Sequence, residues 1–220
     1  MEGLLILFEI IIVNLLLSAD NAIIIAMVSA QLPESKRKTV ILIGTLLAVV
    51  LRCILVLFAL PLLKIPYLQA VGGIFLFVIA IKLLHDQQHD APTSANKPVL
   101  LSLRAGIWTI VTADFVMSLD NVLALAAIAH GDFILIMLGI AISIPMIIWG
   151  SKLVLSLIQK FSFISYIGAA LLAFAAGEML VKDDGLQPLI LRLSPDLLTY
   201  IPLILIPLVV IFGIMKKKTV

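Results

Sequence analysis

The sequence predicts an all-α integral membrane protein with seven transmembrane helices, and three observations support this fold class. The 220 residues are 63% hydrophobic and only 13% charged, and their mean hydropathy of +1.25 is outside the range of ordinary soluble domains. Long apolar segments follow one another along the chain, and two of them contain the same polar motif. The single cysteine, Cys53, excludes an internal disulfide and a cysteine-based metal cluster.

Each apolar segment is close to the roughly 20 residues that a helix needs to cross a bilayer. Polar stretches separate the segments, and the longest of them, residues 85–103, is expected to be a solvated linker. The N-terminal region contains Glu2 and no basic stretch, so we do not expect a cleaved signal peptide. The segments comprise residues 4–30, 40–61, 66–84, 104–130, 133–157, 163–181 and 199–215.

The positions of Lys and Arg predict the orientation, because cytoplasmic loops carry an excess of both residues. With the N-terminus outside, eleven of them fall on the cytoplasmic side and three on the outer side. We therefore expect an external N-terminus and a cytoplasmic C-terminus in a bacterial inner membrane. The cytoplasmic set is Lys36, Arg37, Lys38, Lys82, Lys97, Arg104, Lys152, Lys160, Lys216, Lys217 and Lys218, and the outer set is Lys64, Lys182 and Arg192.

The chain contains an internal repeat of three helices. The motif Ser-x-Asp-Asn occurs at residues 18–21 and again at 118–121, and further along Gly72 aligns with Gly168. Because each unit has three helices, the two units must cross the membrane in opposite orientations, as in many secondary transporters. The predicted organisation is a first repeat at 1–84, a cytoplasmic linker at 85–103, a second repeat at 104–181, and a connection with a C-terminal helix and basic tail at 182–220.

Both motifs place polar side chains along one stripe of a helix. Asn14, Ser18 and Asn21 follow spacings of four and three, and the second motif repeats this pattern with Asp114, Ser118 and Asn121. A charged side chain at the bilayer centre costs about 2.5–3.5 kcal/mol on insertion scales. Carboxylates placed at matched positions despite that cost are expected to be functional.

The oxygen atoms of these residues form a hard ligand set, which suits Mg²⁺, Ca²⁺ or Mn²⁺ better than Zn²⁺ or Cu⁺. If the repeats bring the motif helices together, the ligands converge near the midplane. Glu9 returns to the face of Asp20 and is a further candidate. The predicted ligands are Asp20, Asp114 and Asp120, followed by Asn21, Asn121 and Asn14, with Ser18 and Ser118 assisting.

Several of these residues have simpler interpretations. Ser18 and Ser118, taken singly, are typical of hydrogen bonds between membrane helices. Arg52 is either a counter-ion to the carboxylates without metal or a packing cation. Lys82 and Glu178 occupy matched positions near helix ends, where they either extend to the membrane interface or form a gating ion pair.

The two motif segments, NLLLSADNA at 14–22 and DFVMSLDNVLALA at 114–126, resemble those of the TerC family. The resemblance covers residues 4 to 212. The family is named for tellurite resistance, its bacterial members are associated with Mn²⁺ export, and it is grouped with LysE-type exporters. The resemblance implies a metal site at Asp20, Asn21, Asp114, Asp120 and Asn121. Asn14 stands where the second motif has Asp114, so this site is expected to be asymmetric.

The expected function is export of divalent cations, most of all Mn²⁺, by alternating access. No organic cofactor, enzyme activity or nucleic-acid partner is expected; the expected partners are the lipid bilayer, the cation, and a second copy or other membrane or secreted proteins. The sequence has no phosphate-binding loop for ATP, and protons are a plausible coupling ion. The alternatives are a partner that loads metal into secreted metalloenzymes, an exporter of small organic solutes, and an intramembrane aspartyl protease, whose usual glycine before the aspartate is missing.

Overall fold

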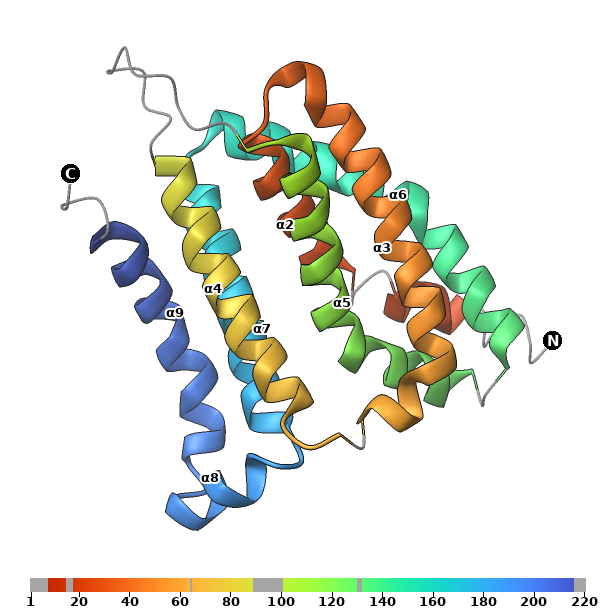
Figure 1. The fold of residues 1–220 in the computed structure, drawn as a ribbon, viewed down its shortest axis with the longest axis vertical. Coiled ribbons are helices and arrows are strands. Elements are labelled where there is room, and N and C mark those ends of the chain that lie inside the picture. The colour runs from red at the N-terminus through yellow and green to blue at the C-terminus, as the bar shows by residue number, and fades with distance from the viewer. Residues whose placement is uncertain (1–7, 15–17, 64, 89–100, 130–131, 216–220) are drawn as a thin grey trace.

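A computed structural model describes residues 8–14, 18–63, 65–88, 101–129 and 132–215; within them, the side chains of 59–63, 87–88, 120, 122–124, 126–127 and 214–215 are not described. Every regular element in these ranges is a helix (Figure 1). In chain order the helices are Phe8–Asn14, α2 (Ala19–Ala30), α3 (Glu34–Leu63), α4 (Leu68–Gln88), α5 (Leu103–Ile128), α6 (Phe133–Lys160), α7 (Phe163–Lys182), α8 (Gln187–Leu193) and α9 (Leu197–Met215).

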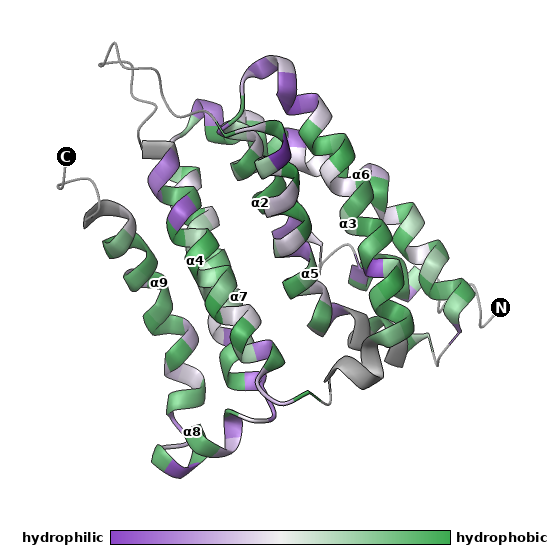
Figure 2. Ribbon diagram, viewed as in Figure 1, coloured by the Kyte–Doolittle hydropathy of each residue, from purple (hydrophilic) through white to green (hydrophobic). Residues whose placement is uncertain are grey.

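The helices follow from the composition of the apolar segments, because a chain in lipid must satisfy its backbone hydrogen bonds internally. Within the described ranges, four helices are long and apolar enough to span a membrane alone, and two bent helix pairs raise the number to six. The predicted all-helical membrane fold is therefore confirmed, while the count of seven spans stays a prediction. Hydrophobic residues cover the middle of the bundle and hydrophilic ones gather toward its ends (Figure 2).

The helices pair in a crossed pattern. The most extensive contacts join α3 to α5, α4 to α7, α7 to α9, and α2 to α6. The second helix of each predicted unit thus packs on the motif helix of the other unit, and the two third helices pack on each other. The core between them consists mainly of Ile, Leu, Ala and Met side chains.

Close helix approaches occur at glycines in both halves of this pattern. A Cβ atom added to Gly139 on α6 would lie 2.3 Å from the side chain of Ile10, and one added to Gly44 on α3 would lie 2.9 Å from Ile110. Ile10 and Ile110 stand at equivalent positions of the two motif segments. In both halves, an isoleucine of the motif segment therefore packs against a glycine of the other unit's second helix.

Three predicted elements differ from the structure. The segment predicted as one helix at 4–30 consists of Phe8–Asn14 and α2, which form a bent pair, whereas α5 continues through the second motif without interruption. The connection predicted after Lys182 contains the helix α8, which meets α9 at 100°. Helix α3 also begins at Glu34 rather than at residue 40, because its polar first turns extend beyond the apolar run.

Candidate metal-ion site

Arg52 lies at the centre of the polar residues of both motifs. It is in the middle of α3, and only 1% of its surface is exposed. A cation removed from water in this way needs a counter-charge and hydrogen-bond acceptors for its donors. The motif residues supply both. We call Arg52 and its four partners Asn14, Ser18, Asp114 and Ser118 the Arg52 cluster.

The guanidinium group donates to all four partners. Nη2 forms a 2.6 Å ion pair with Oδ1 of Asp114, and Nε donates to Oγ of Ser118 at 2.9 Å. Nη1 donates to Oδ1 of Asn14 at 3.3 Å and to Oγ of Ser18 at 3.1 Å. Ser118 in turn donates to Oδ2 of Asp114 at 3.2 Å. One side chain thus connects the stripes of both motif segments.

Helix α6 extends this network. Nδ2 of Asn14 donates to Oγ of Ser143 at 2.7 Å and to the carbonyl of Gly139 at 3.4 Å, both on α6. The sequence analysis did not select Ser143, although it is the only polar side chain between Phe133 and Trp149. A single polar residue in a long apolar run is a signal that would have found it.

Asn21 and Asp114 face the same small cavity. Its volume is about 10 Å³, roughly the space of one water molecule. Three isoleucines, Ile24, Ile25 and Ile110, form the rest of its lining. Asn21 is only 3% exposed, and neither its Oδ1 nor its Nδ2 has a hydrogen-bond partner. A buried amide without partners is costly, so the cavity presents an unused oxygen ligand beside a carboxylate.

The other predicted ligands lie on the same two helices. Asp20 is in the first turn of α2 and half-buried. Asn121 is buried on α5. The backbone of Asp120 belongs to α5, but its side chain lies outside the described part of the structure. Among the described side chains, no three His, Cys, Asp or Glu residues lie close enough to hold a metal ion, so the predicted set of three carboxylates stays a prediction.

Glu9 does not join the buried cluster. Its side chain is exposed, whereas Asn14, five residues later on the same helical stretch, is fully buried. Five residues correspond to about 500° of helical rotation, so the two side chains differ by about 140° in direction. Glu9 is thus directed away from the Arg52 cluster, and its contribution to the site stays a prediction.

Lys82 and Glu178 do not form the predicted gating pair in this structure. Glu178 forms an ion pair with Lys182, one turn along α7. Gly73 on α4 packs against Ala176, and Lys82 lies nine residues beyond that contact, about 13 Å along the helix. Glu178 is near the contact itself, so the two charges are at different levels of the bundle.

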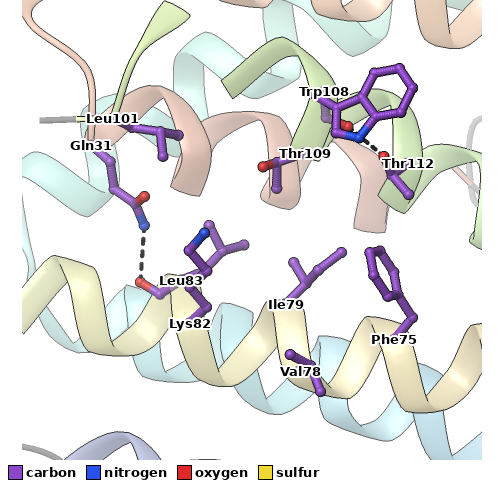
Figure 3. A pocket seen from close by; sticks show the side chains of 10 residues that line it. All are labelled: Gln31, Phe75, Val78, Ile79, Lys82, Leu83, Leu101, Trp108, Thr109 and Thr112. Carbon is purple, nitrogen blue, oxygen red and sulfur yellow. Dashed lines mark hydrogen bonds between the residues drawn. The ribbon is translucent and has the colours of Figure 1, made fainter. Parts of the chain in front are cut away.

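Lys82 instead lines the larger pocket between α4 and α5 (Figure 3). This pocket has a volume of about 280 Å³ and a mostly apolar lining, which includes Phe75, Ile79 and Trp108. None of the predicted metal ligands whose side chains the structure describes lines it. Its composition suits lipid or side-chain packing, so we place the candidate metal site at the smaller cavity beside Asp114.

Asp183 is a buried carboxylate that the sequence analysis did not select. It is 1% exposed at the end of α7. Its oxygens accept from the backbone nitrogens of Tyr67, Ala70, Gly185 and Leu186 at 2.9–3.2 Å. This carboxylate holds the start of α4 against the end of α7, where Tyr67 has a positive φ of 65°. Its role is structural.

The fold and the buried ionic cluster define the class of protein. An all-helical bundle with an apolar outer surface and charged groups at its interior is typical of a multi-pass integral membrane protein. The sequence model of the Integral membrane protein TerC family matches residues 1–220. The chain therefore belongs to the TerC family, which confirms the resemblance found in the motifs.

Three proteins of Bacillus subtilis (strain 168) are similar to this chain. Uncharacterized membrane protein YjbE is 39% identical over 206 residues, which cover 94% of this chain and 92% of YjbE. Uncharacterized membrane protein YceF is 27% identical and covers 66% of this chain and 58% of its own length. Uncharacterized membrane protein YkoY is 33% identical, with 52% and 36% covered. No solved structure matches the chain.

Proposed function

We propose that this protein exports divalent metal cations, most of all Mn²⁺, from the bacterial cytoplasm. The observation that carries the proposal is the pairing of a buried carboxylate, Asp114, with the partnerless amide of Asn21 at one cavity. Carboxylate and amide oxygens are the ligands that hard divalent cations prefer. The buried amide of Asn21 has no hydrogen-bond partner, so the transported cation would supply its stabilising contact.

The other motif residues complete the proposed ligand set. Asp20 and Asn21 occupy the first turn of α2, and Asp120 and Asn121 occupy the matching positions of α5. A divalent ion that binds here would be neutralised by two or three carboxylates, which lowers the cost of the charges in lipid. Asn14, Ser18 and Ser118 hold the Arg52 cluster together and would reach the ion when Arg52 moves away.

The proposed transport cycle uses the two three-helix units as an inverted repeat. Helix α2 packs on α6, α3 packs on α5, and α4 packs on α7. A two-fold relation between the two units would produce this pattern of contacts. The matched Ile10–Gly139 and Ile110–Gly44 contacts also support it. Rocking of one unit against the other would expose the midplane site to each side in turn.

The direct test is metal accumulation in cells exposed to excess Mn²⁺. We expect the native protein to lower cellular Mn²⁺ and Asp120→Asn to abolish this effect at equal membrane expression, because it removes a proposed ligand charge. Asp196→Asn is the matched control, since it neutralises an exposed carboxylate in the turn before α9, and it should behave as the native protein does. Equal accumulation in all strains, with altered activity of secreted metalloenzymes, would refute export and favour metal loading.

A further inference from the structure

Arg52 and Asp114 are buried charged residues whose counterparts in the other repeat are uncharged. Asp114 replaces the Asn14 of the first unit. Counting from the matched Gly44 and Gly139, Arg52 corresponds to Ile147 in the second unit, and that isoleucine is buried on α6. The extra carboxylate of one unit is therefore paired with the extra cation of the other, at 2.6 Å.

Two members of the Arg52 cluster contact the two oxygens of Asp114. Oδ1 accepts from Arg52 and Oδ2 accepts from Ser118. A metal ion that binds Asp114 has to replace the guanidinium, because two cations cannot share one buried carboxylate without strong repulsion. Arg52 and the metal ion thus compete for the same ligand.

The competition also determines the charge of the site without metal. With Arg52 in place, Asp114 is neutralised and four donors of the guanidinium are satisfied. Without Arg52, the empty site would carry an uncompensated carboxylate in the membrane interior, which is costly. In the metal-free protein Arg52 is therefore the counter-charge of Asp114, and this carboxylate needs no cation from solution.

We infer that Arg52 is an internal substitute for the transported cation. It binds Asp114 when the metal has left, and this allows the empty carrier to return across the membrane without a counter-ion. Loading of the metal displaces Arg52 from Asp114. The inference rests on the proposed function and adds to it that transport is net movement of metal rather than obligatory exchange.

The test compares net transport with exchange in proteoliposomes that contain the purified native protein. Net uptake is measured as entry of radiolabelled Mn²⁺ into metal-free vesicles at equal pH, in a buffer whose only other cation besides the proton is impermeant. Exchange is measured with unlabelled Mn²⁺ trapped inside. We expect the native protein to catalyse both. Arg52→Gln should keep exchange but lose at least about tenfold in the ratio of net uptake to exchange, because its empty form has the bare carboxylate.

A binding measurement in detergent gives a second readout. Arg52→Gln should bind Mn²⁺ roughly tenfold more tightly than the native protein, the factor expected if Asp114 is free of Arg52 about a tenth of the time. Arg52→Lys keeps the charge but cannot reach all four partners, so its net-to-exchange ratio should be intermediate. This variant provides the comparison if Arg52→Gln does not fold.

The outcomes separate the inference from the proposed function. A native protein that moves no Mn²⁺ in either assay would overturn the proposed function. A native protein that catalyses exchange but no net uptake would overturn the inference alone. An Arg52→Gln or Arg52→Lys variant with the native ratio and the native affinity would overturn it as well.

Discussion

At the scale of single residues, the Arg52–Asp114 ion pair has no water to solvate it. Such a pair is stable only when its remaining donors and acceptors are satisfied. Asn14, Ser18 and Ser118 satisfy those of the guanidinium. Loss of one charge is therefore more damaging than loss of both, because the partner would stay buried alone.

We predict that Asp114→Leu lowers the free energy of unfolding by about 3–5 kcal/mol, because it leaves Arg52 without its counter-charge. The double variant Arg52→Met/Asp114→Leu should recover most of that loss, since it buries no isolated charge. The measurement is reversible unfolding in mixed detergent micelles, followed by the fluorescence of Trp108 and Trp149.

Lys152→Met is the control for this prediction. It removes an exposed charge on α6 and should change the free energy of unfolding by no more than about 0.5 kcal/mol. If the destabilisation of the double variant equals the sum of the effects of Arg52→Met and Asp114→Leu measured singly, this would contradict the ion pair.

The residues of the site were only partly predictable from the sequence. Spacings of three and four indicated which motif residues share a face, and the structure brings four of them together at Arg52. The role of Arg52 was left open, because a single arginine in an apolar run has no periodicity that indicates its contacts. Glu9 was assigned to the face of Asp20 by assuming one regular helix, whereas Glu9 lies in Phe8–Asn14 and Asp20 lies in α2, the two helices of a bent pair.

At the scale of helices, packing depends on positions without side chains. A Cβ atom at Gly177 of α7 would lie 2.4 Å from Cα of Pro202 on α9, and backbone cannot yield as a flexible side chain does. Near the other end of the bundle, a Cβ atom added to Gly213 of α9 would lie 2.7 Å from the side chain of Leu84 on α4. Helix α9 thus approaches α7 and α4 closely enough to be part of the bundle.

We predict that Gly177→Ala destabilises the protein by about 1–3 kcal/mol, because the added methyl group separates α7 from α9. Gly150→Ala on α6 is its control: the added Cβ would lie 3.8 Å from Cβ of Ala22, an ordinary contact. The comparison is made from the midpoints of thermal unfolding in the same detergent. Equal midpoints for the two variants would show that α9 does not depend on this contact.

The helices themselves were largely predictable, because apolar runs of about 20 residues in lipid have no alternative to helix. The ends of the helices were less predictable, because polar turns such as the start of α3 continue the helix beyond the apolar run. The short α8 was missed because seven residues give too little pattern to distinguish a helix from a loop.

At the scale of the whole molecule, the described basic residues other than Arg52 separate between the two ends of the bundle. The start of α3, the end of α4, the start of α5 and the end of α6 lie together at one end, and α8 lies at the other (Figure 1). The first group carries most of the Lys and Arg that the sequence assigns to the cytoplasm. The fold and the charge bias therefore agree on which helix ends share a side, and the charge rule alone assigns that side.

We predict that the end with α3's first turn is cytoplasmic. In a Cys53→Ala background, an impermeant maleimide applied to intact cells should label Asp196→Cys, which lies in the turn before α9. It should label Ser35→Cys and Ser162→Cys only after the membrane is opened, because both are exposed at the opposite end. The reverse pattern would invert the orientation and leave the fold intact. Labelling of Ser35→Cys and Ser162→Cys from different sides would contradict the arrangement of the helices, since it would place the starts of α3 and α7 across the membrane from each other.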